Sequence, residues 1–313
     1  MHQTVTTALD LLTGKYVFPD RAAAAADAVR ERLAAGDYEG LDEAALGERL
    51  TGHLFDVCAD RHLRVRLREA GAAGRTGQAD AAAAWAEYLR LTGYRIARAE
   101  RLDGNVGFLD LRGVSDPALG GRAIAAAMEL VAHTDALIID LRRNRGGAPD
   151  GVAFWCSYFF PDADTHLNDV YDRGTGRTRQ YWTLGHLPGA RYLDRPVYVL
   201  TSDFTFSAGE ELAYNLQALG RATLIGQTTR GGAHPTDAFA ITDTLEITIP
   251  TARSINPVTG TNWEGVGVKP DLEVPAEQAF TVAYRAALRH VLDTATAPLI
   301  LDEATEALRE HTD

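Results

Sequence analysis

The chain has 313 residues, enough for one large domain or two domains of ordinary size. Apolar residues make up 46% and charged residues 24%, which is the balance of a globular protein rather than a disordered or fibrous one. The net charge of −12 leaves no basic surplus to bind phosphate groups, so we expect neither nucleic acid nor a membrane as a partner.

The N-terminus lacks a basic segment followed by an apolar one, and no run approaches the ~20 apolar residues of a membrane span. Cys58 and Cys156 show neither metal-site spacing nor the density of a disulfide scaffold, so we expect buried free thiols. These features predict a cytoplasmic protein, with secretion after removal of a signal left open.

The first part of the chain, residues 1–67, is predicted to be a small helical unit because its apolar residues recur at helical spacing. Residues 63–67 alternate like a half-buried strand. Residues 68–92 are expected to form a linker and a short helix, and the stretch 69–80 within them, rich in glycine and alanine, a flexible connection. The remainder, 93–313, is predicted to be the core.

Strands and helices alternate in this core. The expected strands are 94–100, 106–111, 136–141, 197–200, 223–226, 239–242 and 245–250, and the expected helices 116–132, 152–160, the segment after 207, and 275–292. The βαβαβ order predicts an α/β fold, with a mostly parallel sheet and flanking helices.

One junction organises the rest of the chain. Residues 197–200 are typical of a buried strand, and Leu212, Leu216 and Leu219 follow at helical spacing. Ser207 therefore lies at the carboxyl end of a strand, where the N-terminus of the next helix offers unpaired N–H groups to an oxyanion. This placement suits a nucleophile, and the alternative is a serine that only caps the helix.

Five segments in the same order resemble the C-terminal processing (tail-specific) serine protease family, most closely its interphotoreceptor-retinoid-binding-protein-like branch. They are Asp60-Arg-His62, Leu137-Ile-Ile-Asp-Leu-Arg-Arg-Asn-Arg-Gly-Gly147, Thr201-Ser-Asp-Phe-Thr-Phe-Ser-Ala-Gly-Glu-Glu211, Gly226-Gln-Thr-Thr-Arg-Gly-Gly-Ala-His-Pro235 and Glu264-Gly-Val-Gly-Val-Lys-Pro-Asp271. The resemblance covers nearly the full length and implies a ClpP/crotonase-like core.

The chain departs from this family at two points. Many members use a serine-lysine dyad, and the position of that lysine is Gly232 here, while Lys15 and Lys269 are the only lysines. No segment resembles the PDZ insert that processing proteases place between the helical unit and the core. The dyad mechanism therefore does not carry over.

The tricorn core protease, a relative in the same superfamily, resembles this chain in placing a histidine at His62 and a glutamate at Glu264. An imidazole has a suitable pKa to take the proton of a serine, and a carboxylate can orient the imidazole. The predicted catalytic triad is therefore Ser207, His62 and Glu264, split between the helical unit and the core. His234, in the glycine-rich loop, is the alternative base or a substrate contact.

Gly146 and Gly147 follow the central strand at the end where α/β sheets bind ligands. One of their N–H groups, together with that of Ala208, is expected to form the oxyanion hole, the alternative being a simple strand-to-helix turn. Asp140, Arg142 and Asn144 are expected to support this loop.

These features predict a serine peptidase that cleaves peptides or unstructured protein tails through an acyl-enzyme, with no organic cofactor and no metal. A non-catalytic carrier of an apolar ligand, such as a retinoid or fatty acid, is the alternative that the retinoid-binding branch implies. An esterase or acyl-transfer enzyme would share the same site. The sequence determines neither peptide specificity nor oligomeric state.

Overall fold

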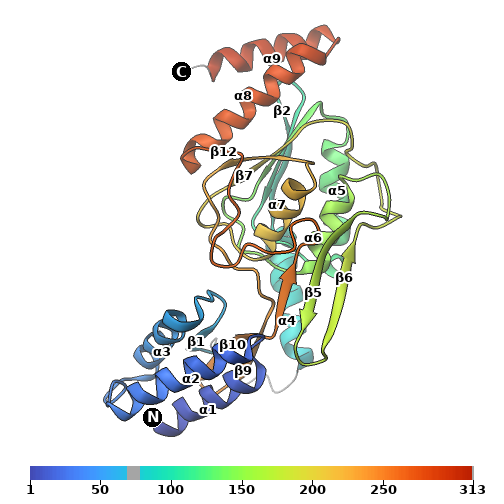
Figure 1. The fold of residues 1–313 in the computed structure, drawn as a ribbon. Helices are drawn as coiled ribbons and strands as arrows, with labels where there is room; N and C mark the ends of the chain where they lie inside the picture. Colours follow the sequence, from blue (N-terminus) through green and yellow to red (C-terminus); the bar gives the residue numbers. More distant parts are fainter. Residues whose placement is uncertain (69–77, 312–313) are drawn as a thin grey trace. The chain divides into compact units, whose positions relative to one another are not determined.

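The computed structural model describes residues 1–68 and 78–311 (Figure 1). The chain divides into two compact units. The helical unit comprises Met1–Trp85, Asp169–Arg179 and Gly232–Ile255, and the sheet unit comprises Ala86–Asn168, Gln180–Gly231 and Asn256–Asp313. Most of the connection predicted to be flexible, residues 69–77, lies outside the described residues, and helix α4 (Gln78–Leu91) begins directly after it.

Three helices form the N-terminal part of the helical unit: α1 (His2–Lys15), α2 (Pro19–Ala34) and α3 (Glu43–Cys58). Helix α3 begins where the Asp42 carboxylate accepts a hydrogen bond of 2.8 Å from the Ala45 N–H. The apolar stripes that predicted these helices meet in one core that includes Leu12, Val29, Leu50 and Leu54.

The helical unit also contains an antiparallel sheet in the order β1-β10-β9, made of β1 (Arg64–Leu67), β10 (Leu245–Pro250) and β9 (Thr236–Ala240). Ile247 and Ile249 of β10 belong to the same core as the three helices. Strand β11 (Ala252–Ile255) pairs with β5 (His166–Asp172), which neighbours β6 (Arg177–Trp182). Residues 232–255, which the sequence placed in the core, thus cluster with the N-terminal helices.

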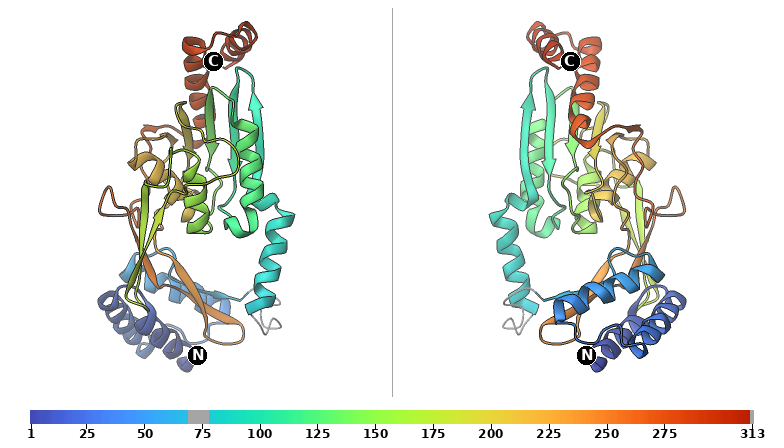
Figure 2. Two further views of the ribbon diagram at one scale, coloured as in Figure 1. Left: turned by 90° about the vertical axis from the view of Figure 1, so that its right-hand side faces the viewer. Right: turned by 90° about the vertical axis from the view of Figure 1, so that its left-hand side faces the viewer.

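The sheet unit is built on six strands in the order β12-β8-β7-β4-β3-β2. Their bounds are β2 (Ile96–Leu102), β3 (Val106–Leu111), β4 (Ala136–Asp140), β7 (Val197–Thr201), β8 (Thr223–Gly226) and β12 (Leu272–Glu273). Strands β2 and β3 form an antiparallel hairpin at one edge, in cyan in Figure 2, and the other neighbours pair in parallel. The predicted mostly parallel α/β fold is confirmed.

Helices flank this sheet: α5 (Pro117–Val131), α6 (Pro149–Ser157), α7 (Ala208–Ala218) and α8 (Ala276–Thr294), with a short 3-10 turn at Gly93–Arg95. Every residue of β4 is buried, as a strand covered on both faces requires. Ile138 of β4 and Leu200 of β7 pack in one core with Ala283 and Leu288 of α8. The parallel strands thus end together at one edge of a buried sheet.

Helix α9 (Pro298–Glu310) has no counterpart among the predicted elements. The sequence does carry the helical signal, because Ile300, Ala304, Ala307 and Leu308 recur at helical spacing and pack on one core, so the prediction stopped one helix too early. Cys58 and Cys156 are buried free thiols, as predicted. Among the described helices, none combines the length and apolar character needed to cross a membrane.

Gly226, at the end of β8, lets two parallel strands approach. Its φ is +135°, and a Cβ there would lie 2.1 Å from the backbone oxygen of Thr201 in β7. We expect Gly226→Ala to lower the free energy of unfolding by about 2–4 kcal/mol, through overpacking and an unfavourable φ. Gly220→Ala is the matched control, because φ there is +65° but no atom lies within 4 Å of the added Cβ. Chemical denaturation measures both, and equal losses would contradict the close approach.

Candidate active site

Ser207 lies in the turn between β7 and α7 with a strained backbone. Its φ of 56° and ψ of −126° belong to a region that favours glycine. Neighbouring hydrogen bonds fix this turn: the Thr205 hydroxyl donates to the carbonyl of Leu141 (2.8 Å), and the Phe206 N–H donates to the carbonyl of Asn144 (3.1 Å). A strained strand-to-helix turn of this kind presents a serine hydroxyl at the edge of a sheet.

Two glycines pack directly beside this turn. A Cβ on Gly146 would lie 2.6 Å from the Cβ of Ser207, and one on Gly147 would lie 1.9 Å from the carbonyl oxygen of Val114. Both glycines have positive φ, 93° and 153°. Only glycine fits at these positions, because any side chain would push the loop away from the serine.

The predicted oxyanion donors differ in their availability. The Gly146 N–H donates a hydrogen bond of 2.8 Å to the Asn144 side-chain oxygen, so it is already used. Within residues 1–68 and 78–311, neither the Gly147 N–H nor the Ala208 N–H donates a hydrogen bond. These two groups are therefore the pair that can receive a developing oxyanion, and the prediction narrows to Gly147 and Ala208.

The loop after β4 has the supporting side chains that the sequence predicted. The Arg142 guanidinium donates two hydrogen bonds, of 2.9 and 2.7 Å, to the Asp140 carboxylate and one of 2.7 Å to the carbonyl of Ala276. The Asn144 amide donates to the carbonyl of Leu111 (2.9 Å) while its oxygen holds Gly146. None of the three side chains is left to react.

Glu210 is a fully buried carboxylate on the first turn of α7. One of its oxygens accepts the Ser207 N–H at 2.8 Å. The other accepts the Thr229 hydroxyl at 2.5 Å and the Gly231 N–H at 2.6 Å. Glu210 thus connects the Ser207 turn to the glycine-rich loop.

The same network reaches the loop that carries Glu264. The Val268 N–H donates to the Thr229 hydroxyl at 2.7 Å, and the Gly265 N–H donates to the carbonyl of Gly231 at 3.3 Å. The Glu264 N–H itself donates to the Asn262 side chain at 2.9 Å, and the Glu264 side chain is half-buried. This part of the predicted triad is therefore held in the same unit as Ser207 by a short chain of hydrogen bonds.

The two candidate bases lie in the helical unit, gathered around Asp60. Asp60 is 1% exposed, and one of its oxygens contacts the His234 Nδ1 at 2.8 Å and accepts the Tyr16 hydroxyl at 3.1 Å. Its other oxygen accepts the backbone N–H of His62 at 3.0 Å. The Phe18 ring meets the His234 ring edge to face at 5.1 Å. Asp60 therefore fixes the backbone of one histidine and the side chain of the other.

Electrostatics distinguish the members of this cluster. Burial works to raise the pKa of Asp60, but the hydrogen bond from His234 and the charges of His234 and His62 outweigh it and hold that pKa below its usual value. Burial lowers the pKa of His62 to about 4, although the Asp60 charge acts in the opposite direction. His62 is thus neutral at pH 7, the form that can accept a proton.

Reasoning from the sequence did not single out Asp60 and Glu210, whose carboxylates hold the candidate site residues in place. Asp60 precedes His62 by two positions, and Glu210 stands three positions after Ser207, which is the spacing of a capping box. That spacing could have revealed Glu210, because a glutamate at N3 reaches back to the N–H of the residue before the helix. The pairing of Asp60 with His234 has no local signal, since the two residues lie 174 positions apart.

Comparisons with known proteins agree with this architecture. The description "Peptidase family S41" matches residues 105–274. The chain is 32% identical over 123 residues to the carboxyl-terminal-processing protease of Synechocystis sp., covering 39% of this chain and 27% of that protein. A candidate peptidase from Parabacteroides merdae has a similar fold, with TM-score 0.62, 17% identity and 95% and 99% of the two chains covered. A lipoprotein from Streptococcus agalactiae gives TM-score 0.55, 15% identity and coverages of 90% and 93%.

The fold and the Ser207 turn define the class, an α/β protein with a strained serine at the carboxyl edge of a mostly parallel sheet. Because the family match spans more than half of the sequence, this chain belongs to peptidase family S41. The family predicted from the five motifs is confirmed, and the retinoid-binding-protein-like branch stays a prediction. The chain spans about a quarter of the length of the Synechocystis protease, and the solved structures support the fold alone.

Two neighbouring glutamates provide a test of the Glu210 network. In Glu210→Gln, an amide NH2 group replaces one carboxylate oxygen and faces the N–H and O–H groups that donate to Glu210 in the wild type. Because donors cannot bond to one another, we expect a loss of about 2–4 kcal/mol in the free energy of unfolding. Serine-directed labelling of Ser207 should also slow by about tenfold or more, because the turn loses its anchor. Denaturation and labelling kinetics measure the two effects.

Glu211→Gln is the matched control. Burial raises the pKa of Glu211 to about 8 despite a hydrogen bond from Asn168, so this side chain is mostly protonated at pH 7 and an amide can replace it. From pH 4.5 to 8 the unfolded chain releases this proton while the folded chain keeps it, so the wild type loses stability as the pH rises. Glu211→Gln should remove that loss. Equal effects of the two substitutions at pH 7 would contradict the special role of Glu210.

Proposed function

We propose that this protein is a serine peptidase that cleaves peptides or unstructured protein tails through an acyl-enzyme. The observation that carries the proposal is the strained Ser207 turn beside the unused N–H groups of Gly147 and Ala208. Membership of peptidase family S41 supports the same reaction class. A serine that only capped a helix would not need φ of 56° or a glycine pair packed against it.

In the proposed reaction the Ser207 hydroxyl attacks the scissile carbonyl while a base takes its proton. The carbonyl oxygen becomes an oxyanion that the Gly147 and Ala208 N–H groups receive. The base then protonates the leaving amine, which departs and leaves an acyl-enzyme on Ser207. Water, activated by the same base, releases the acyl group. Each step uses side chains and backbone of the protein and calls for no cofactor.

We propose His62 as this base and Glu264 as the carboxylate that stabilises its charged form. His234 is 4% exposed, and its Nδ1 is already paired with Asp60. A carboxylate at Nδ1 can also orient a catalytic imidazole, so it is the near-complete burial of His234 that suits a residue holding the helical unit together. His62 is half-buried and neutral at pH 7, as a base must be before it accepts a proton. His234 remains the alternative base.

The sequence also suggested a carrier of an apolar ligand and an esterase or acyl-transfer enzyme, and different observations distinguish each of them from a peptidase. A carrier of an apolar ligand needs an apolar cavity, whereas the cavity at the carboxyl ends of β3, β4 and β7 is lined by ten charged side chains beside three phenylalanines. An esterase or acyl-transfer enzyme would use the same Ser207 chemistry. Matched ester and peptide substrates distinguish it from a peptidase.

The first test is covalent labelling. A fluorophosphonate should react at Ser207 within minutes to hours at neutral pH, because only an activated serine attacks it quickly. Ser207→Ala should abolish the adduct, which mass spectrometry of the intact protein and of its peptides detects. A folded wild-type protein that remains unlabelled would refute the hydrolase proposal and favour the carrier.

The second test concerns the base. We expect His62→Ala to slow acylation by ~10³- to 10⁴-fold. The acid limb of the pH profile of kcat/KM should lie below 6.5, toward the lowered pKa of His62. Labelling rates and stopped-flow assays measure both.

The control for this test is His234→Asn, which keeps a donor that can face Asp60 and avoids leaving a buried charge unpaired. This variant should remain folded and lose much less acylation rate than His62→Ala. The reverse ranking would assign the base to His234.

A further inference from the structure

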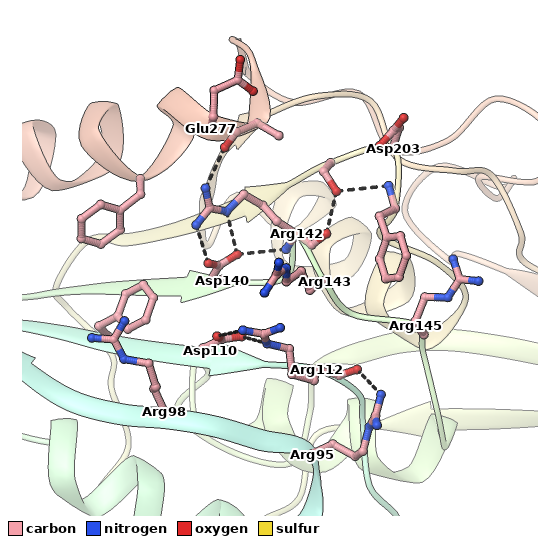
Figure 3. A pocket seen from close by; sticks show the side chains of 15 residues that line it. Arg95, Arg98, Asp110, Arg112, Asp140, Arg142, Arg143, Arg145, Asp203 and Glu277 are labelled. Carbon is pink, nitrogen blue, oxygen red and sulfur yellow. Dashed lines mark hydrogen bonds and ion pairs between the residues drawn. The ribbon is translucent and has the colours of Figure 1, made fainter. Parts of the chain in front are cut away.

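The sheet unit contains a cavity of about 1240 Å³ at the carboxyl ends of β3, β4 and β7 (Figure 3). Open α/β sheets bind ligands at this edge. We call the cavity the arginine pocket, because six arginines line it: Arg95, Arg98, Arg112, Arg142, Arg143 and Arg145. Only four carboxylates line it, in a chain whose net charge is −12. The local charge is therefore opposite to that of the whole protein.

Half of these arginines have carboxylate partners. Arg112 donates two hydrogen bonds of 2.5 Å to Asp110, and Arg142 is held in the same way by Asp140. Arg98 pairs with Glu100. These pairs shape the wall of the pocket, and their charges are largely cancelled.

Three other arginines form no ion pair among the described residues. Arg95 donates to the Tyr88 hydroxyl and to the carbonyl of Arg112 (2.8 Å), which are neutral groups. Arg143 is exposed, and the Arg145 guanidinium lies over the Phe204 ring at 4.3 Å. Asp203 and Glu277 also line the pocket, but Figure 3 shows Glu277 beyond Arg142, on the side away from Arg95. Asp203 and Glu277 offset two of these three charges, so one positive charge remains in excess, and the end of the pocket that holds Arg95 and Arg145 lies away from Glu277.

This end of the pocket adjoins the proposed nucleophile. Arg145 directly precedes Gly146, which packs against Ser207. Arg145 and Arg230 both lie about 6 Å from the centre of the Phe206 ring, and Phe206 directly precedes Ser207. The Nε of Arg230 is buried and makes no hydrogen bond within the described part of the chain. A positive strip therefore runs from the pocket to the serine turn.

Two features of this positive strip are unfavourable without a bound anion. Burial, and then the nearby charge of Arg230, lower the pKa of Arg145, which means that two like charges are held close in a partly desolvated place. A buried N–H without an acceptor adds a further cost. A bound carboxylate would relieve both, since guanidinium groups match its two oxygens.

We infer that the arginine pocket binds carboxylate groups of the peptide substrate, and so directs the enzyme toward acidic peptides. The inference rests on the proposed peptidase function and adds a substrate class to it. The carboxylate could come from Asp and Glu side chains or from the C-terminus, and both would meet the same arginines. Phe108, Phe204 and Phe280 line the pocket as well and provide apolar surface for the rest of the peptide.

The test uses the full chain with Ser207→Ala, so that peptides bind without being cleaved. Four fluorescein-labelled decapeptides are compared by fluorescence anisotropy: alternating Ala and Glu, or alternating Ala and Gln, each with a free or an amidated C-terminus. We expect the Glu peptides to bind at least about tenfold more tightly than the amidated Gln peptide. The difference should shrink at high salt. Tight binding of amidated Glu peptides identifies side chains as the source, and tight binding of the free-ended Gln peptide identifies the C-terminus.

Arg143→Gln with Arg145→Gln, in the same Ser207→Ala background, should bring all four affinities to within about twofold of one another. Arg143→Lys with Arg145→Lys should keep part of the difference, because lysine keeps the charge without the paired donors. Arg289→Gln with Arg309→Gln is the matched control, since it removes two exposed charges outside the pocket and should change nothing. Thermal melting confirms that each variant is folded.

The outcomes separate this inference from the proposed function. Equal binding of all four peptides, or a preference that survives Arg143→Gln with Arg145→Gln, overturns the inference even if fluorophosphonate labels Ser207 in the wild type. A preference that depends on Arg143 and Arg145 in a protein that the probe never labels supports the pocket and overturns the peptidase proposal. Where the probe does label Ser207, cleavage of a mixed peptide library by the wild type should show the same acidic preference.

Discussion

A single buried carboxylate, that of Glu210, holds the candidate site together. Burying a carboxylate costs several kcal/mol unless hydrogen-bond donors surround it, and here the donors come from the Ser207 turn and from the glycine-rich loop. The turn and the loop must therefore stay where they are for the carboxylate to stay satisfied. Thr229 extends the same constraint to the loop of Glu264 through Val268. The proposed chemistry rests on this interior anchor.

The elements that the sequence predicted best are those with strong local signals. Strand β4 is apolar throughout and buried throughout, so its pattern had one interpretation. The hairpin of β2 and β3 turns next to Gly104, whose φ of 72° a glycine adopts without cost. The strand, turn and helix around Ser207 were predicted because they follow one another within a few residues. For these elements the information lay within one short window, whereas the proposed role of Ser207 drew on five motifs spread along the chain.

What the sequence could not provide depends on contacts between distant residues. Strand β1 pairs with β10, where Arg66 lies opposite Glu246, 180 positions away. This pairing of two strands places residues 232–255 in the helical unit. The contact between Asp60 and His234 lies in the same unit and joins residues 174 positions apart. Periodicity and spacing report neither of these two contacts. The hydrogen bond from the Gly146 N–H to the Asn144 side chain is local by contrast, an Asx-type turn over two positions that the sequence analysis did not use.

The backbone of Ser207 has a consequence for how the protein would respond to selection for thermal stability alone. At φ of 56° and ψ of −126° a glycine would sit with less strain than a serine, by about 1–3 kcal/mol. Replacing Ser207 by glycine would therefore be an easy way to stabilise this turn, and it would remove the hydroxyl. With Ser207 as the proposed nucleophile, libraries screened only for heat resistance would enrich inactive proteins, and a screen that preserves turnover must select for the strained conformation directly.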